Sequence, residues 1–208
     1  NNRGALAGGT ITVDASGVTP GTVNLTPAVA TNWSASNTGA AGDGGSISII
    51  GSSVTRLGTA GTLSLLANGP SAAGGTGNGG SVSVTAIGAT GDILFASGST
   101  IINTRGGLTG GKGGTVSLTA DRTINYTGAA SAINASPTAG SGNGGTVTII
   151  ASNAVNGGTV NLTAPVTASG SGTGDGGKIS LTNNSSGATQ INSPLTASSG
   201  TNGVGGTI

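Results

Sequence analysis

The sequence contains no cysteine, methionine or histidine, and only one tryptophan, one tyrosine and one phenylalanine among its 208 residues. The absence of cysteine excludes disulfide bonds and thiol chemistry. The absence of histidine removes the side chain that most often acts as a general acid or base near neutral pH. Because aromatic side chains supply much of the bulk of a thick core, the composition instead favours a thin core of small aliphatic residues.

Charge is equally sparse, since 5% of the residues are charged and the net charge is +1. The basic residues are scattered along the chain, so no basic patch for nucleic acid is expected. Glutamate is absent, and the only carboxylate side chains belong to five aspartates. No apolar run approaches the length of a membrane-spanning helix. We therefore expect neither a nucleic-acid partner nor membrane insertion.

Glycine is abundant, with 44 residues, and much of it belongs to a motif that returns seven times. Each copy has two small residues, usually Gly-Gly, followed by alternating polar and apolar residues. The glycine pairs of the seven copies begin at Gly8, Gly44, Gly79, Gly113, Gly144, Gly176 and Gly205. Successive copies are 36, 35, 34, 31, 32 and 29 residues apart. Self-similarity at such a period is typical of solenoid proteins.

Two more strand-like segments follow the motif within a unit. The second segments are predicted at residues 21–25, 61–65, 91–95, 122–126, 158–162 and 189–191. The clearest third segments are predicted at residues 101–104, 133–136, 166–169 and 195–198. Turns rich in Gly, Asn, Ser and Thr separate them, and no segment has helical periodicity. Each unit is therefore predicted to hold three short strands.

This pattern predicts an all-β fold, a parallel β-helix (β-solenoid) of six to seven coils with 29–36 residues each, as one open-ended domain over residues 1–208. The apolar motif positions should form an inner ladder of Ile11, Ile47, Val82, Val116, Val147 and Ile179. The preceding positions should form an outer ladder of Thr10, Ser46, Ser81, Thr115, Thr146 and Lys178. The glycine pairs are expected to supply positive φ angles at the corners.

Segments such as 142–149 (GNGGTVTI) and 174–181 (GDGGKISL) resemble the repeats of filamentous haemagglutinin-like, two-partner-secretion bacterial exoproteins. The resemblance covers nearly the whole chain. It implies a right-handed β-helix, export across a Gram-negative envelope, and a role as the shaft of an adhesin or surface fibre. An extracellular or cell-surface location follows from the same resemblance.

Calcium binding and catalysis are the first alternatives to a structural role. The stacked position two residues before the second glycine reads Ala7, Asp43, Asn78, Lys112, Asn143, Asp175 and Val204. A lysine in this column opposes a cation ladder, so Asn and Asp are interpreted as turn formers and no metal or cofactor is expected.

Glycoside hydrolysis needs two carboxyl groups facing one cleft. Asp43 and Asp175 share a repeat position but lie four coils, roughly 19 Å, apart. We therefore predict no enzymatic activity, and we interpret Asp121–Arg122 as a surface ion pair or a turn.

Binding to ice or to glycans is a further alternative. Thr10-Ile11-Thr12 and Thr146-Val147-Thr148 fit a flat Thr-x-Thr ladder of the kind that orders water, but serines and Lys178 interrupt it. Glycan binding usually relies on exposed aromatic side chains. Trp33 is the one exposed candidate and could equally cover an end of the rod, while Phe95 and Tyr126 are predicted to point inward.

The open ends of the solenoid give an assembly hypothesis. The unpaired edge of the last copy, Thr207 and Ile208, is predicted to pair with the first strand of another copy, formed by Thr10, Ile11, Thr12 and Val13. One interpretation is therefore a subunit that stacks head to tail into a filament. The other is one stretch of a longer shaft. The expected partners are copies of the chain or flanking coils, together with host or surface glycans.

Overall fold

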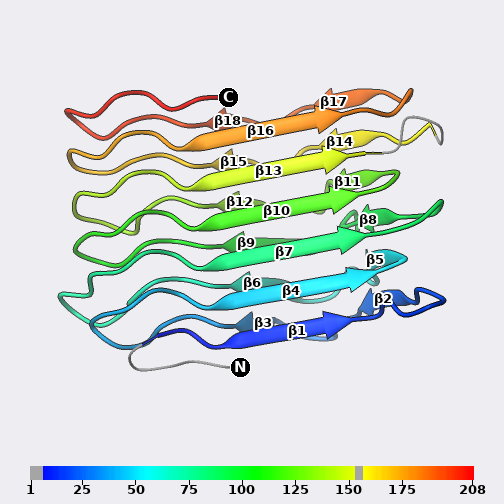
Figure 1. The fold of residues 1–208 in the computed structure, drawn as a ribbon, viewed down its shortest axis with the longest axis horizontal. Helices are drawn as coiled ribbons and strands as arrows, with labels where there is room; N and C mark the ends of the chain where they lie inside the picture. The colour runs from blue at the N-terminus through cyan, green and yellow to red at the C-terminus, as the bar shows by residue number, and fades with distance from the viewer. Residues whose placement is uncertain (1–6, 153–156) are drawn as a thin grey trace.

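The strands of this protein are short and alternate between β-branched apolar residues and small polar ones, so each strand can bury one face only by stacking on its neighbours. The computed structural model describes residues 7–152 and 157–208. The chain winds through six coils, and each coil places one strand in each of three parallel sheets (Figure 1). The predicted β-solenoid is confirmed.

Each sheet takes every third strand of the chain. The first sheet contains β1 (Thr10–Asp14), β4 (Ser46–Gly51), β7 (Ser81–Ala86), β10 (Thr115–Ala120), β13 (Thr146–Ala151) and β16 (Lys178–Asn183). The second contains β2 (Thr22–Leu25), β5 (Ser53–Arg56), β8 (Asp92–Leu94), β11 (Ile124–Tyr126), β14 (Val160–Leu162) and β17 (Thr189–Ile191). The third contains β3 (Thr31–Ser34), β6 (Thr62–Leu66), β9 (Ser99–Asn103), β12 (Ala132–Asn134), β15 (Val166–Thr167) and β18 (Leu195–Thr196).

The register of the first sheet is the one that the repeats predict. Ile11 pairs with Ile47, and the column continues through Val82, Val116, Val147 and Ile179. All of these side chains are buried except that of Ile11, which is half-buried at the first strand. The outer ladder from Thr10 to Lys178 is likewise in register.

One predicted strand belongs to a different sheet. The sequence pattern predicts residues 61–65 as the second strand of their coil, which is wrong, because Thr62–Leu66 is the third strand and Ser53–Arg56 is the second. The Gly-Thr-apolar pattern of residues 61–63 is shared by both kinds of strand, so the pattern alone does not distinguish them. The distance along the chain does, because Ser53 follows only one corner after β4 and pairs with Thr22.

The glycine pairs serve close backbone approach rather than positive φ, which corrects the sequence-based expectation. The glycines of the pairs from Gly44 to Gly177 do not have the positive φ angles found at other glycines such as Gly111 and Gly140. A Cβ built on Gly145 would instead collide with the carbonyl oxygen of Gly114 in the coil below. That carbonyl accepts a hydrogen bond from the Thr146 N–H at 3.0 Å, so the adjoining strand can begin to pair at once.

The same corner also closes each coil on itself. The N–H of Gly145 donates to the carbonyl of Ala135 at 2.7 Å, and Gly177 and Ala168 form the same bond one coil later. Small side chains end the third strand of each coil, and they form a column of Ala35, Ala67, Thr104, Ala135, Ala168 and Ala197. Small residues are required there because the glycine backbone packs directly against them.

Three aromatic side chains complete the core. Phe95 and Tyr126 are fully buried, as predicted, and their rings meet edge to face with centroids 5.7 Å apart. Trp33 lies on β3, half-buried against the aliphatic core of the first coil. The longest axis of the molecule runs along the strands rather than along the stack of coils (Figure 1). Six coils therefore form a slab, which becomes a long rod only when more coils are added.

The inner ladder can be tested with a charge. Replacing the fully buried Val116 with aspartate should abolish folding or cost more than about 4 kcal/mol, because it places an unpaired carboxylate between two apolar neighbours. The matched control is Ser117→Asp on the outward face of the same strand, expected to cost about 1 kcal/mol or less. Urea unfolding followed by circular dichroism measures both. Equal stability of the two variants would contradict the register.

Candidate functional site

The residues predicted to form the assembly edge lie at opposite ends of the stack (Figure 1). Thr10–Val13 belong to β1, the first strand of its sheet, which pairs with β4 on one side. At the other end Thr207 forms a parallel bridge with Lys178, and Ile208 is 67% exposed. The structure thus places both segments at strand edges. Their pairing with a second copy remains a prediction.

An apolar hollow of about 330 Å³ opens at the first coil. Its walls include Val13, Val23, Leu25 and Trp33, with Asn24 and other polar residues at the side. Trp33, for which the sequence suggests either an exposed glycan platform or a cover for the end of the rod, lies half-buried in this wall. Both roles remain predictions.

Over its four middle strands, the outer face of the first sheet is an uncharged surface of hydroxyl side chains, with one isoleucine on β4 and one on β13. Asp14 and Lys178, the charged residues on this face, lie on the first and last strands, β1 and β16. Between them, β4, β7, β10 and β13 present three outward columns, namely Ser46, Ser81, Thr115 and Thr146, then Ser48, Ser83, Ser117 and Thr148, then Ile50, Thr85, Thr119 and Ile150. Lys178 thus borders this surface and does not interrupt it.

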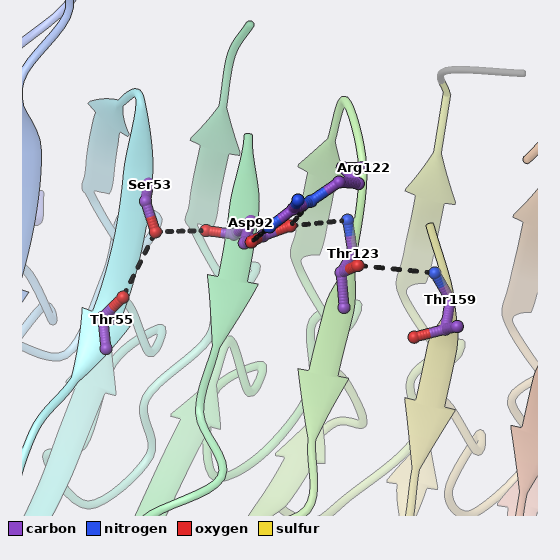
Figure 2. Close-up of polar contacts among 6 residues, drawn as sticks. All are labelled: Ser53, Thr55, Asp92, Arg122, Thr123 and Thr159. Atoms are coloured by element: carbon purple, nitrogen blue, oxygen red, sulfur yellow. Dashed lines mark hydrogen bonds and ion pairs between the residues drawn. The ribbon is translucent and has the colours of Figure 1, made fainter. Parts of the chain in front are cut away.

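A line of polar contacts crosses the second sheet (Figure 2). The Arg122 guanidinium pairs with both carboxylate oxygens of Asp92 in the coil below, and the Thr123 N–H also donates to Asp92 Oδ1 at 3.1 Å. The ion pair raises the pKa of Arg122. Ser53 Oγ donates to the Asp92 carbonyl at 3.1 Å, which extends the line to the preceding coil. These groups hold neighbouring coils together.

Of the two expectations for Asp121–Arg122, the ion pair is wrong, since Arg122 pairs with Asp92 of the previous coil, while the two residues do lie at the bend between β10 and β11. Asp121 accepts hydrogen bonds from the Gly88 N–H at 2.6 Å and from Ser152 Oγ at 2.9 Å. It therefore joins the coils on both sides of it. Asp121 and Arg122 are adjacent in sequence, yet each bonds to neighbouring coils rather than to the other. The sequence of a single repeat does not reveal such contacts.

Arg56 is a buried cation in an otherwise apolar column. It is 1% exposed and follows Leu25 in the register of the second sheet. Its guanidinium donates to the carbonyl oxygens of Gly58, Ala60 and Gly61 at 2.8, 3.1 and 2.8 Å. Burial lowers the pKa of Arg56. The charge is thus solvated by the carbonyl dipoles of the turn that follows β5, which fixes the shape of that turn.

The Asx positions of the glycine-rich corner form a ladder of hydrogen bonds between coils. Asp43 Oδ1 accepts from the Asn78 N–H at 2.8 Å, and Asn78 Oδ1 accepts from the Lys112 N–H at 2.9 Å. Two coils later, Asn143 and Asp175 repeat the contact at 3.1 Å. Asp43 and Asp175 are therefore used in the corner column. Within residues 7–152 and 157–208, no three acidic side chains gather into a possible metal site.

Sequence reasoning identified this column as turn-forming but missed that it bonds across coils. The available signal was the recurrence of Asn or Asp at one stacked position, since a side chain there always meets the same backbone N–H of the next coil. Lys112 interrupts the side-chain ladder without breaking the stack, because its backbone N–H still donates to Asn78.

Comparison with known proteins identifies no relative. No protein-family model, no curated protein and no solved structure matches this chain. The described residues also contain no helix long and apolar enough to cross a membrane.

The buried phenol of Tyr126 predicts a loss of stability in alkali. Its hydroxyl donates to the Thr100 carbonyl at 2.7 Å and lies 3.1 Å from the Ala132 carbonyl, and burial raises its pKa far above the ordinary value of 10.0. The phenol is therefore ionised first in the unfolded chain. Its contribution to stability is complete below pH 10 and is lost as the pH rises further, by about 1.4 kcal/mol per pH unit.

The control for this titration is Tyr126→Phe. The variant should lose about 1–3 kcal/mol at neutral pH, because the buried Thr100 carbonyl loses its donor. Its stability should then fall less steeply than that of the unmodified protein above pH 10, as measured by urea unfolding over a pH series. Parallel pH profiles for the two proteins would show that Tyr126 is not the titrating group.

Proposed function

We propose that this chain is a mechanical element, one stretch of the shaft of a secreted bacterial surface fibre. The observation that supports the proposal is the unbroken register of three parallel sheets through six coils. Each coil is bonded to the next through backbone ladders on all three faces. Such a stack resists bending and stretching along its whole cross-section, and its stability grows with the number of coils.

The side chains that connect the coils serve the same mechanical role. The Asp92–Arg122 ion pair, the Asp121 contacts and the Asx ladder all run along the stack. They add side-chain bonds at the corners and edges of the sheets, beside the backbone hydrogen bonds that join the coils there. Within the described residues, these polar side chains are already hydrogen-bonded to neighbouring coils. The proposed role does not require them to bind a ligand or to catalyse a reaction.

Location outside the cell is part of the proposal and rests on the resemblance of the repeats to exported adhesin-like proteins. The chain's composition suits that environment, because it lacks the oxidisable residues cysteine and methionine. Low charge and a continuous hydrogen-bonded backbone are also compatible with an extended, protease-resistant fibre.

The test is the intact mass of the native polypeptide that carries these residues, together with electron micrographs of the same material and antibody labelling of intact cells. The shaft proposal predicts a polypeptide many times heavier than the 19.0 kDa of this sequence, with thin fibres labelled at the surface. A 19-kDa species that forms long fibres would favour head-to-tail stacking through β1 and Thr207 instead. A 19-kDa monomer that forms no fibres would overturn both.

A second candidate function is supported by the hydroxyl surface of β4, β7, β10 and β13. An uncharged, regularly spaced array of hydroxyl groups can form many weak hydrogen bonds to a neutral polysaccharide or to ice. Replacing Ser83 and Ser117, at the centre of this surface, with lysine should weaken retention on an insoluble neutral polysaccharide and reduce ice shaping. The matched control places the same lysines at Asn125 and Asn161 on the second sheet. Absence of binding by the unmodified chain would remove this candidate.

A further inference from the structure

The corner column of Asx side chains has one gap in the middle of the stack. In this column, each Asp or Asn accepts a hydrogen bond from the N–H of the equivalent residue one coil above. These bonds join Asp43 to Asn78, Asn78 to Lys112, Asn143 to Asp175 and Asp175 to Val204, at 2.8, 2.9, 3.1 and 2.8 Å. The step from Lys112 to Asn143 is missing from the series, because a lysine side chain has no acceptor.

The backbone at this step is the same as at the others. Gly113 donates to the Asn143 carbonyl at 2.9 Å, just as Gly79 donates to the Lys112 carbonyl at 2.9 Å. The coils are therefore in register, and only the side chain differs. Among the described contacts, the Asn143 N–H has no hydrogen-bond partner. An N–H thus remains open where the neighbouring corners hold a carboxylate or amide oxygen.

The open N–H lies in a positively charged part of the surface. Lys112 is exposed and lies directly below Asn143 in the column. The corner loop that ends at Lys112 also contains Arg105 and no acidic residue. The carboxylates of the column, Asp43 and Asp175, each lie two coils from Lys112, roughly 10 Å at the strand spacing. Repulsion of an anion by charges at that distance is largely screened at physiological salt.

The chemical group that fits this gap is a carboxylate. At the corners on either side, the same N–H position is already filled by an oxygen of Asp or Asn. A carboxylate from another molecule would accept from the Asn143 N–H and pair with the Lys112 ammonium, which are both charge-assisted contacts.

The first corner provides a contrast within the same chain. The Asp43 N–H also has no partner among the described contacts, since Ala7 lies below it and has no acceptor. No cation stands at that position in the column, however, and the side chain of Asp43 is itself negatively charged. An anion is therefore repelled at the first corner and attracted at Lys112.

We propose that Lys112 and the Asn143 N–H form a binding site for a carboxylate group, carried by a uronic acid residue of an acidic polysaccharide. A sugar is favoured as the carrier because the hydroxyl surface of the first sheet begins at Thr115 and Thr146, about three residues or roughly 10 Å beyond this corner. The site has coils on both sides, so it depends on neither end of the stack. It goes beyond the functions proposed above, and only the choice of carrier draws on the hydroxyl surface.

The test is a titration of the isotope-labelled whole chain with sodium galacturonate, followed through the backbone amide signals by NMR. Galactose is the neutral control, and sodium chloride keeps the ionic strength constant. The Asn143 amide signal should shift with a dissociation constant on the order of 10 mM, since one exposed ion pair and one hydrogen bond contribute little. Galactose should not shift it, and the Asp43 amide signal should stay in place with both sugars.

Two lysine variants that lose the same charge locate the site. Lys112→Asn supplies the missing acceptor for the Asn143 N–H and removes the cation, so binding of galacturonate should weaken at least about fivefold. This variant should fold, because Asn already occupies the column in other coils. Lys178→Asn removes a charge from an exposed residue of the first sheet, and binding should be unchanged.

Two results would overturn the carboxylate site. One is an Asn143 signal that shifts equally in chloride and in galacturonate, and the other is a shift that persists in Lys112→Asn. The carrier is tested separately with an oligogalacturonate, which should bind at least about fivefold more tightly per uronate than the monomer, because further sugar residues reach the hydroxyl surface. An aspartate peptide of equal charge that binds more tightly than the oligogalacturonate would overturn the choice of a sugar. None of these outcomes depends on whether the chain forms fibres.

Discussion

The spacing between coils is the constraint on which the rest of this structure depends. Parallel strands hydrogen-bond at about 4.8 Å, so every residue must fit beneath the equivalent residue of the next coil at that distance. At the glycine-rich corner the backbones come closest, and Gly114, Gly145 and Gly177 leave no room for a Cβ. Each column of the stack is therefore restricted to the residue types that can be repeated at this spacing.

Columns that face inward satisfy the constraint with Ile, Val and Leu, which interlock when repeated. Columns at the corners satisfy it with Asn and Asp, whose side chains bond to the backbone of the next coil. Arg56 breaks the rule in one coil. Its charge is tolerated because three carbonyl oxygens of the following turn accept the hydrogen bonds that water would otherwise accept from the guanidinium. With a side chain that has no donors at this position, those carbonyls would have to bond to solvent instead.

The sequence was sufficient to predict the solenoid, the three strands per coil and the register of the first sheet, because the alternating motif recurs with little change. It failed for residues 61–65, since second and third strands share one local pattern. It also gave the wrong role to the glycine pairs, because a close backbone approach and a positive φ both favour glycine. The Asp92–Arg122 pair and the Asx ladder were missed for a common reason. Both join residues about 30 positions apart, and only the stacked geometry brings them together.

The bond that closes each coil, between Gly145 and Ala135 and their equivalents, has a consequence for how such a protein changes in evolution. Because it fastens the corner loop at its base, residues can be inserted beyond it without moving the strands, and the loops indeed differ in length from coil to coil. A whole unit contacts only the units before and after it. Recombination that gains or loses complete repeats therefore recreates the same interfaces, so the number of coils can vary between generations while the fold is retained.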